Sequence, residues 1–199
     1  MPPSLQVTRS SRSVESRAAI ATTTLIQSPE PGRDTLPTMF GINGELFHIG
    51  IRVVDLAASM REIGASHGLT WASVQDRPMN VWVPGDGQVT LQLALTYSCE
   101  GPIHLELMSG PAGSVWDGSG QPGPHHLGYW VDDVGAETER LLARDWTLEL
   151  AAAPPDAGYG RFTYLRSPEG VLVEPVSTSA RPRFEAWWAG GDLAPAASA

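Results

Sequence analysis

The chain repeats one short sequence pattern, and this repeat limits the folds that it can adopt. His48 aligns with His126 at a shift of 78 residues (126 − 48). The same shift matches three more pairs of identical residues: Gly50 with Gly128, Val53 with Val131, and Asp55 with Asp133. Internal similarity at a fixed spacing indicates copies of one supersecondary unit. We therefore expect two related modules that pack together.

Each copy begins with an apolar strand and continues into a helix. Asp55 and Asp133 stand where a helix N-cap is expected, because their side chains can accept hydrogen bonds from the first helical turn. Residues at helical spacing follow in both copies: Leu56, Met60 and Ile63 in the first, and Val134, Thr138, Leu141 and Leu142 in the second. His67 and Gly68 are predicted to end the first helix.

Further strands are predicted after each helix. They cover residues 71–75, 79–83, 89–98 and 102–108 in the first copy, and residues 147–151, 161–166 and 171–176 in the second. Each copy is thus a strand, a helix and three strands, with one extra hairpin strand in the first copy. The fold class is therefore α+β. A short helix near the C-terminus is expected to bury Phe184, Trp187 and Trp188.

Four side chains with metal-binding chemistry occupy equivalent positions in the two copies. His48 and His126 lie near the start of the first strand of each copy, and Glu106 and Glu174 lie in the last strand. Because side chains alternate along a strand, each of the four lies opposite a continuous apolar face. That apolar face should pack on the helices, so the four polar side chains should line the space that the sheet encloses. This donor set suits Zn, Ni, Co, Mn or Fe.

Other side chains are candidate ligands for a substrate. Residues 88–98 alternate between apolar and uncharged polar residues, and we expect the polar face, including Gln92, to line the cleft. Arg52 shares a face with His48 and is assigned either to a substrate carboxylate or to a structural salt bridge. Five aromatic side chains could stack on a flat ligand: Trp116, Tyr129, Trp130, Phe162 and Tyr164. From these groups we predict Arg52, Gln92, Trp130 and Tyr164 as substrate-binding residues.

Two more histidines and one loop lie near these elements in the sequence. His104 is predicted on the cleft face, at the rim, and His125 on the opposite, packed face. The glycine-rich segment 110–120 is either a loop over the cleft mouth or a plain linker between the modules. It lacks the strand-to-helix context of a phosphate-binding loop.

Composition excludes several functions. All 13 cationic residues are Arg, so a lysine Schiff base, a pyridoxal-phosphate anchor and a Walker-type loop cannot form. The net charge is −9, which disfavours nucleic-acid binding. No apolar run reaches the length of about 18 residues that a membrane span needs. The single cysteine, Cys99, excludes an intrachain disulfide, and we expect an inert thiol in a cytoplasmic protein.

The motifs around these residues resemble the vicinal oxygen chelate superfamily, which includes glyoxalase I, methylmalonyl-CoA epimerase, extradiol dioxygenases and bleomycin-binding proteins. They are residues 47–51 with 55–56, 105–107, 125–128 with 131–133, and 170–174. The resemblance implies two paired βαβββ modules that form a cupped, incompletely closed eight-stranded barrel. It also implies His48, Glu106, His126 and Glu174 as the metal ligands, and a homodimer.

The resemblance and the predicted elements together suggest a division of the chain. Residues 1–44 form a disordered tail, residues 45–110 the first module, residues 111–124 a linker loop, residues 125–182 the second module, and residues 183–199 a C-terminal helix and tail. The tail is rich in Ser, Thr, Arg and Pro, which cannot supply a core.

The resemblance is nearest to the glyoxalase and epimerase branch, because extradiol dioxygenases usually need only three ligands and bleomycin binders lack the set. It implies a metal-dependent lyase or isomerase for a small carbonyl or hydroxy-carbonyl substrate. Glu174 would take the α-proton and the metal would stabilise the enediolate, with Glu106 as the second catalytic carboxylate. One departure is that no Glu in residues 72–98 matches the second base of the epimerases; Gln88 and Gln92 occupy that region. An Fe(II) ring-cleaving dioxygenase and a non-catalytic drug-binding protein remain alternatives.

Overall fold

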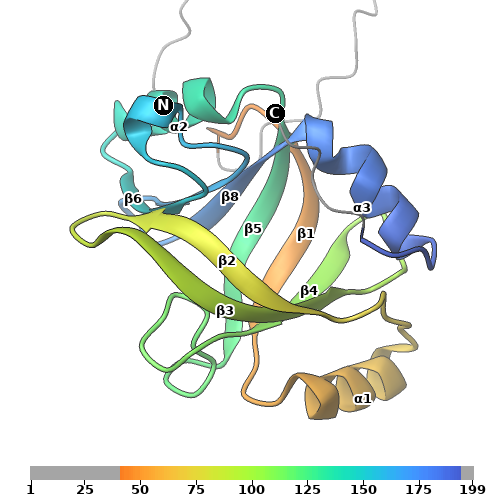
Figure 1. Cartoon of the computed structure of the whole chain (residues 1–199). Helices are drawn as coiled ribbons and strands as arrows, with labels where there is room; N and C mark the ends of the chain where they lie inside the picture. The colour runs from red at the N-terminus through yellow and green to blue at the C-terminus, as the bar shows by residue number, and fades with distance from the viewer. Residues whose placement is uncertain (1–40, 194–199) are drawn as a thin grey trace, which may run out of the picture. The chain divides into compact units, whose positions relative to one another are not determined.

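The computed structural model describes residues 41–193, in which eight strands form a closed barrel (Figure 1). The first module contains β1 (Glu45–Arg52), α1 (Leu56–His67), β2 (Gln75–Val83), β3 (Gly87–Tyr97) and β4 (His104–Ser109). The second module contains β5 (Gly123–Val131), α2 (Val134–Leu142), β6 (Thr147–Ala151), β7 (Thr163–Arg166) and β8 (Leu172–Ser177). The short 3₁₀ helices η2 (Pro155–Ala157) and η3 (Thr178–Ala180) and the helix α3 (Arg181–Trp188) complete the set.

The order of strands around the barrel is β1-β4-β3-β2-β6-β7-β8-β5. In each module the first strand runs parallel to the last, as β1 does to β4 and β5 does to β8. The predicted α+β fold with two βαβββ modules is confirmed. The extra strand predicted at residues 71–75 is wrong, because Trp71 makes only a single bridge to Ser98 and β2 already begins at Gln75.

The modules meet along two seams of unequal length. The antiparallel pair β1–β5 runs nearly the full length of both strands, whereas β2 and β6 share only the pair Trp82–Ala151. We expected an incompletely closed barrel, and this one short contact is what closes it. Trp82 is the next-to-last residue of β2, so the end of this strand makes the contact.

Both long helices begin where the sequence predicts, and α1 also ends where it predicts. The Asp55 side chain accepts a hydrogen bond from the Ala58 backbone N–H at 2.8 Å, and Asp133 accepts one from Ala136 at 2.9 Å. Gly68 ends α1 with a φ of 68°, a left-handed conformation that glycine adopts without a steric penalty. These caps satisfy backbone groups that would otherwise lack partners at the helix ends.

The strands separate two apolar cores. One fills the barrel interior and includes Met79, Leu95 and Leu172. The other lies between the outer face of the second module and α2, and includes Val134, Leu141 and Val173. In β8 the consecutive residues Leu172 and Val173 contribute to different cores, so side chains alternate between the two faces of this strand as predicted.

One strand departs from simple alternation. The β1–β5 register shifts between Leu46 and His48, which is the mark of a β-bulge. The bulge allows Phe47 and His48, which are consecutive, both to be buried, and Phe47 joins the core inside the barrel. The apolar face opposite His48, which by alternation includes Phe47, is predicted to pack on the helices, and for Phe47 this prediction is wrong.

The described part of the chain begins inside what we predicted as the N-terminal tail. Ile42 is fully buried in the core next to α2, and the Asn43 backbone N–H donates to Glu137 at 3.0 Å. The ordered domain therefore extends to at least residue 41. Residues 1–40 of the predicted tail, and residues 194–199, lie outside the described residues. Among residues 41–193, no helix is long and apolar enough to cross a membrane.

The C-terminal helix α3 forms where the aromatic spacing predicts it. Trp187 is fully buried, and its indole N–H donates to the Ser73 carbonyl at 2.9 Å. Phe184 and Trp188 pack against the core inside the barrel. Helix α3 lies beside β1 and β4 in Figure 1, so it covers part of the barrel opening instead of packing on the outer surface of the sheet.

Candidate metal centre

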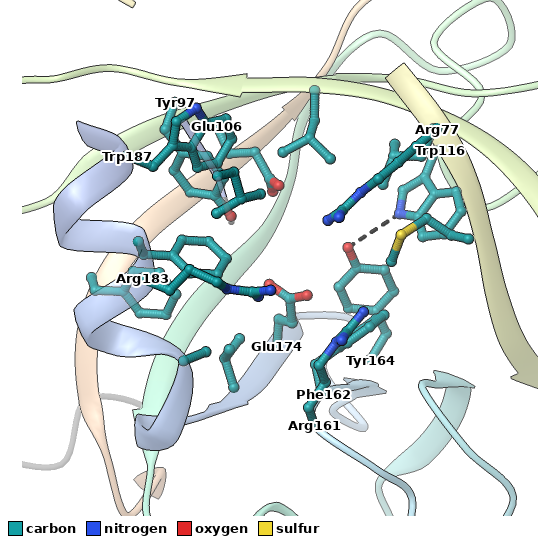
Figure 2. Close-up of a pocket in the computed structure, with 18 residues that line it drawn as sticks. Arg77, Tyr97, Glu106, Trp116, Arg161, Phe162, Tyr164, Glu174, Arg183 and Trp187 are labelled. Carbon is teal, nitrogen blue, oxygen red and sulfur yellow. Dashed lines mark hydrogen bonds between the residues drawn. The ribbon is translucent and has the colours of Figure 1, made fainter. Parts of the chain in front are cut away.

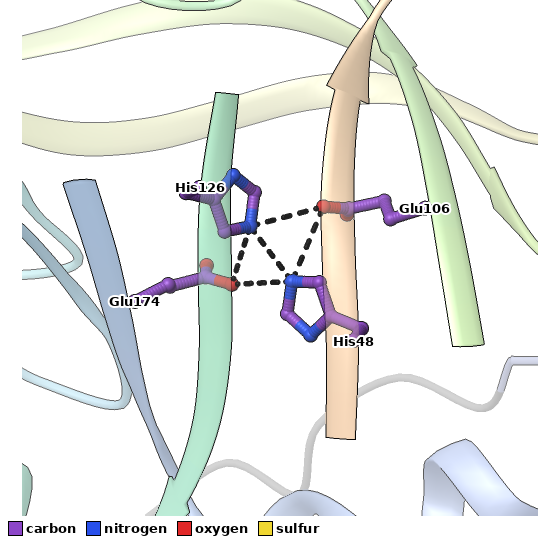
Figure 3. Close-up of side chains that lie close together, drawn as sticks. All are labelled: His48, Glu106, His126 and Glu174. Atoms are coloured by element: carbon purple, nitrogen blue, oxygen red, sulfur yellow. Dashed lines mark hydrogen bonds and ion pairs between the residues drawn. The ribbon is translucent and has the colours of Figure 1, made fainter. Parts of the chain in front are cut away.

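Four buried side chains from four strands meet inside the barrel (Figure 3). His48 comes from β1, Glu106 from β4, His126 from β5 and Glu174 from β8. These strands are neighbours in the order β4-β1-β5-β8, so each side chain needs to extend only a short way from its strand. The structure thus brings together all four residues that the sequence repeat predicts as metal ligands.

Two glycines make room for the two imidazole rings. Gly128 pairs with His48 across the β1–β5 seam, and Gly50 pairs with His126. A Cβ atom at Gly128 would lie 1.8 Å from the His48 ring, and one at Gly50 would lie 2.1 Å from the His126 ring. Both distances are far inside van der Waals contact, so any larger residue would displace the ring. The spacing of His and Gly two residues apart in each repeat therefore has a structural reason.

The donor atoms are close enough to share one ion. His48 Nε2 lies 2.7 Å from His126 Nε2, and the two imidazoles lie 3.1–3.5 Å from the Oε2 atoms of Glu106 and Glu174. All four donor atoms lie within 4.8 Å of one another. Ligands bound at about 2.1 Å in adjacent positions are about 3.0 Å apart. The residues therefore fit a divalent ion, and this donor set matches ions that accept both nitrogen and carboxylate ligands.

The charges of His126, Glu106 and Glu174 depend on their neighbours in the cluster. Burial alone lowers the pKa of His126, but the charge of Glu174 and hydrogen bonding to Glu106 and Glu174 outweigh it and raise that pKa to about 9. Burial alone raises the pKa of Glu106 and of Glu174, but contacts with the two imidazoles outweigh it and lower both. Both carboxylates are therefore held ionised, which is the form that binds a cation.

A tyrosine stands beside each carboxylate. Tyr97 on β3 pairs in register with Glu106, and Tyr164 occupies the matching strand, β7, beside Glu174. Burial and then the charge of the adjacent glutamates raise the pKa of both phenols well above the usual value. Trp116 donates its indole N–H to the Tyr164 hydroxyl oxygen at 3.2 Å. Each glutamate therefore has a neutral hydrogen-bond donor next to it.

A cavity opens above the two glutamates (Figure 2). Its volume is about 70 Å³, and Glu106 and Glu174 form part of its wall. The rest of the wall is largely apolar and aromatic and includes Phe47, Leu95, Trp116, Phe162, Phe184 and Trp187. His48 and His126 are buried behind the glutamates and do not line the cavity. A ligand in the cavity would therefore meet the carboxylates first.

The predicted substrate-binding residues are only partly brought to this cavity. Tyr164 lines it, and Trp130 lies in the same core, stacked on Phe47 at a centroid distance of 3.7 Å. Arg52 does not line it; its guanidinium donates to Gln121 at 3.1 Å and to the Val115 carbonyl, both in the segment that joins the modules. Arg52 therefore holds this segment against the barrel.

Gln92 lies on the outer face of the barrel. It is exposed and donates to Asp76 at 2.5 Å, while its neighbour Leu93 lines the cavity. The prediction that the polar face of residues 88–98 lines the cleft is therefore wrong. Absence of charge on a strand face does not by itself indicate a cleft, because cross-strand pairs such as Thr90 with Asn80, at 2.7 Å, satisfy an uncharged outer face equally well.

Three aromatic and imidazole side chains also differ from expectation. Tyr129 packs in the core next to α2, outside the barrel, and so cannot stack on a ligand in the cavity. His104 is buried, not at the rim, and stacks on Trp188 with a centroid distance of 3.7 Å. His125 contacts His126, with 3.0 Å between the two Nδ1 atoms, instead of pointing to the packed face. Burial lowers the pKa of His125 to about 3, so it is a neutral neighbour of the centre.

Sequence reasoning missed several residues of the cavity wall. Three arginines line it: Arg77 from β2, Arg161 from the β6–β7 connection, and Arg183 from α3. These arginines lie far apart in the sequence, and the aromatic spacing of α3 predicts only a packing role for that helix. Alternation along β2 placed Arg77 on the same face as Met79 and Val81, and that was the available signal.

Comparison with known proteins agrees with this architecture. The sequence model of the Glyoxalase/Bleomycin resistance protein/Dioxygenase superfamily matches residues 47–164, which is more than half of the chain. No curated protein sequence matches the chain with significance.

Several solved structures are similar in fold. One is a methylmalonyl-CoA epimerase in complex with methylmalonyl-CoA and ammonium, with 21% identity over 69% of this chain and 96% of that chain, and a TM-score of 0.48. Another is methylmalonyl-CoA epimerase from Mycobacterium tuberculosis, with 21% identity over 68% of this chain and 88% of that chain, and a TM-score of 0.46. A hypothetical protein from Bacillus halodurans C-125 has 19% identity over 68% of this chain and 95% of that chain, with a TM-score of 0.49. Similarity at this level gives no information about the reaction.

Proposed function

Because the chain belongs to the Glyoxalase/Bleomycin resistance protein/Dioxygenase superfamily, we propose that it is a divalent-metal-dependent lyase or isomerase of a small carbonyl or hydroxy-carbonyl compound. The observation that carries this proposal is the convergence of His48, Glu106, His126 and Glu174 beside a largely apolar cavity, with the two glutamates on its wall. A buried donor set that opens on one side into a cavity leaves room for a ligand beside the ion.

The four side chains would hold the ion, and the two glutamates would also face the substrate. A bound divalent ion supplies Lewis-acid polarisation of a carbonyl or hydroxyl oxygen, which acidifies the adjacent C–H bond. Glu174 is positioned to accept that proton, because its carboxylate is ionised and lies on the cavity wall. Glu174 would then return this proton to the substrate, and Glu106, the second carboxylate that the substrate would meet, would be an alternative acceptor because it is ionised too.

The surrounding residues would orient these carboxylates and exclude water. Tyr97 and Tyr164 stand beside Glu106 and Glu174, and burial keeps both phenols protonated as donors. Among the residues described as lining the cavity, Glu106 and Glu174 are the only carboxylates. This wall therefore has no carboxylate that could accept a proton without also being a metal ligand. We infer that a metal ligand itself acts as the base, and not a separate pair of carboxylates.

Replacing Glu174 with glutamine tests this role. Glu174→Gln keeps the size of the side chain and an oxygen ligand but removes the proton acceptor, so metal content should persist while turnover falls by at least about 100-fold. The assay would use methylglyoxal with glutathione, acyl-CoA epimers and catechols as test substrates, with Glu169→Gln at an exposed turn as the control. Unchanged turnover in metal-loaded Glu174→Gln would exclude Glu174 as the base.

Two other functions remain outcomes of the same assay. Oxygen uptake with catechols, absent under nitrogen, would identify an Fe(II) ring-cleaving dioxygenase. Tight binding of an aromatic compound by the metal-free protein, without turnover, would identify a binding protein whose aromatic wall residues such as Trp116 and Phe162 hold the ligand. A homodimer in the cytoplasm is also part of our proposal, and sedimentation would measure the oligomeric state.

A further inference from the structure

The cavity carries an arginine cluster that the metal chemistry does not need. Arg77, Arg161 and Arg183 come from three separate elements, and all three line the same cavity wall as Glu174. Figure 2 shows their guanidinium groups pointing into the cavity. They are close enough to act on one another, because Arg161 lowers the pKa of both Arg77 and Arg183 in addition to the effect of burial.

Mutual repulsion and burial make this arrangement unfavourable on its own. Two of the three, Arg77 and Arg183, are partly buried, and within residues 41–193 no ion pair is formed by Arg77 or Arg161. The Arg77 Nε atom is buried and has no hydrogen-bond partner among the described residues. A buried donor without a partner costs about 1–3 kcal/mol, so an arrangement of this kind is expected to have a ligand.

The charge balance of the cavity points to an anion. The ionisable groups on its wall, apart from the two tyrosines, are the three arginines and the two metal-binding glutamates. A divalent ion would balance the two glutamates, because metal-bound histidines are neutral. The positive charges of Arg77 and Arg161, which form no ion pair within residues 41–193, would then remain on the wall in a chain whose net charge is −9. The cluster therefore stands out against the acidic background of the protein.

We propose that the substrate is an anionic, partly apolar molecule whose carboxylate or phosphate group binds Arg77, Arg161 and Arg183. Its carbonyl or hydroxyl oxygen would point to the glutamates, and its apolar part would lie against Phe162, Phe184 and other apolar wall residues. Planar guanidinium groups bind carboxylate and phosphate oxygens in pairs, which gives both affinity and orientation. This inference rests on the proposed function, since it assigns the substrate class of the same cavity.

A pair of dyes that differ only in one anionic group tests the arginines directly. Anilinonaphthalene sulfonate carries a negative charge, and phenylnaphthylamine has the same aromatic frame without it. In the full-length protein loaded with Zn²⁺, Arg77→Gln and Arg183→Gln should each weaken binding of the sulfonate about tenfold, and binding of the neutral dye less than twofold. Arg144→Gln, at an exposed site on the second module, is the matched control and should change neither.

Competition then identifies the anionic group. Benzoate and phenyl phosphate would displace the sulfonate dye, and benzyl alcohol would not; the stronger of the two anions shows whether the cluster favours a carboxylate or a phosphate. Three results would each overturn the inference. The arginine variants could lose affinity for both dyes equally, or bind the sulfonate dye as the wild type does. The wild-type protein could also fail to bind the sulfonate dye.

Metal content measured on the same samples separates this inference from the proposed function. Selective anion binding in a protein that holds no metal would leave the arginine site standing and remove the metal-dependent reaction. If the protein holds metal but the arginine variants change the binding of both dyes equally, the metal-dependent reaction would stand and the arginine site would be excluded.

Discussion

Adding one methyl group at Gly128 should abolish metal binding. The new Cβ atom would lie 1.8 Å from Cε1, 2.1 Å from Nδ1 and 2.5 Å from Nε2 of His48. Non-bonded carbon atoms pack at about 3.5–4.0 Å, so the imidazole must move by about 1.7 Å or more. It cannot do so freely, because His48 is fully buried between Phe47 and Tyr97.

A displacement of that size exceeds what a metal site tolerates. Ligand distances in metal sites hold to about 0.2 Å, so His48 would be lost as a ligand. We expect the affinity for Zn²⁺ to fall by at least about 100-fold in Gly128→Ala, measured by competition with a chromogenic chelator. Overpacking should also lower the free energy of unfolding by about 1–3 kcal/mol, measured by urea denaturation monitored by circular dichroism.

Two further variants separate the clash from a general loss of structure. Gly120→Ala is the control, because its Cβ would meet no atom closer than Asp117 Oδ2 at 3.7 Å, and it should bind metal normally. The double variant His48→Ala/Gly128→Ala removes the clash, so it should be more stable than Gly128→Ala while still failing to bind metal. Wild-type metal affinity in a folded Gly128→Ala protein would refute the reasoning.

Three more predictions concern stability. At a free metal concentration 100 times the dissociation constant, metal binding should stabilise the fold by about 2.7 kcal/mol. Removing the metal with a chelator should therefore lower the melting temperature by roughly 5–11 °C. His126→Ala should melt at the same temperature with and without chelator. Trp187→Ala should lower the free energy of unfolding by about 3–5 kcal/mol in a denaturant titration, because it empties a fully buried site, and a loss below about 1 kcal/mol would show that α3 does not depend on it. Asp133→Ala should cost about 1 kcal/mol in the same titration through loss of the α2 cap, and no change would mean that water replaces the cap.

The repeat and strand alternation were enough to predict two strand–helix–three-strand modules and the convergence of the four candidate ligands, whereas the barrel was predicted from the family resemblance. His48 and His126 follow from alignment of the two copies, and Glu106 and Glu174 from their place in the last strand of each. These features are local and periodic, so they can be read from one chain. The helix caps at Asp55 and Asp133 belong to the same class of local signals.

The cavity wall could not be predicted in the same way, because it depends on non-local packing. A bulge in β1 turns Phe47 inward, and nothing in the sequence marks that register shift. The arginines Arg77, Arg161 and Arg183 lie far apart in the chain and meet only through closure of the barrel and docking of α3. Gln92, in contrast, was predicted to line the cavity but lies outside it. An uncharged polar face whose side chains form cross-strand hydrogen bonds has the same sequence pattern as a face that lines a cleft.

The most direct test of the metal centre is the metal content of the purified protein after saturation with a divalent ion and removal of the excess. Elemental analysis should find one ion per chain in the wild type and in Gly120→Ala. It should find none in His48→Ala or His126→Ala, provided that circular dichroism shows both variants to be folded. Absence of bound metal in the wild type, or the same content in all four proteins, would contradict a metal centre built from His48, Glu106, His126 and Glu174.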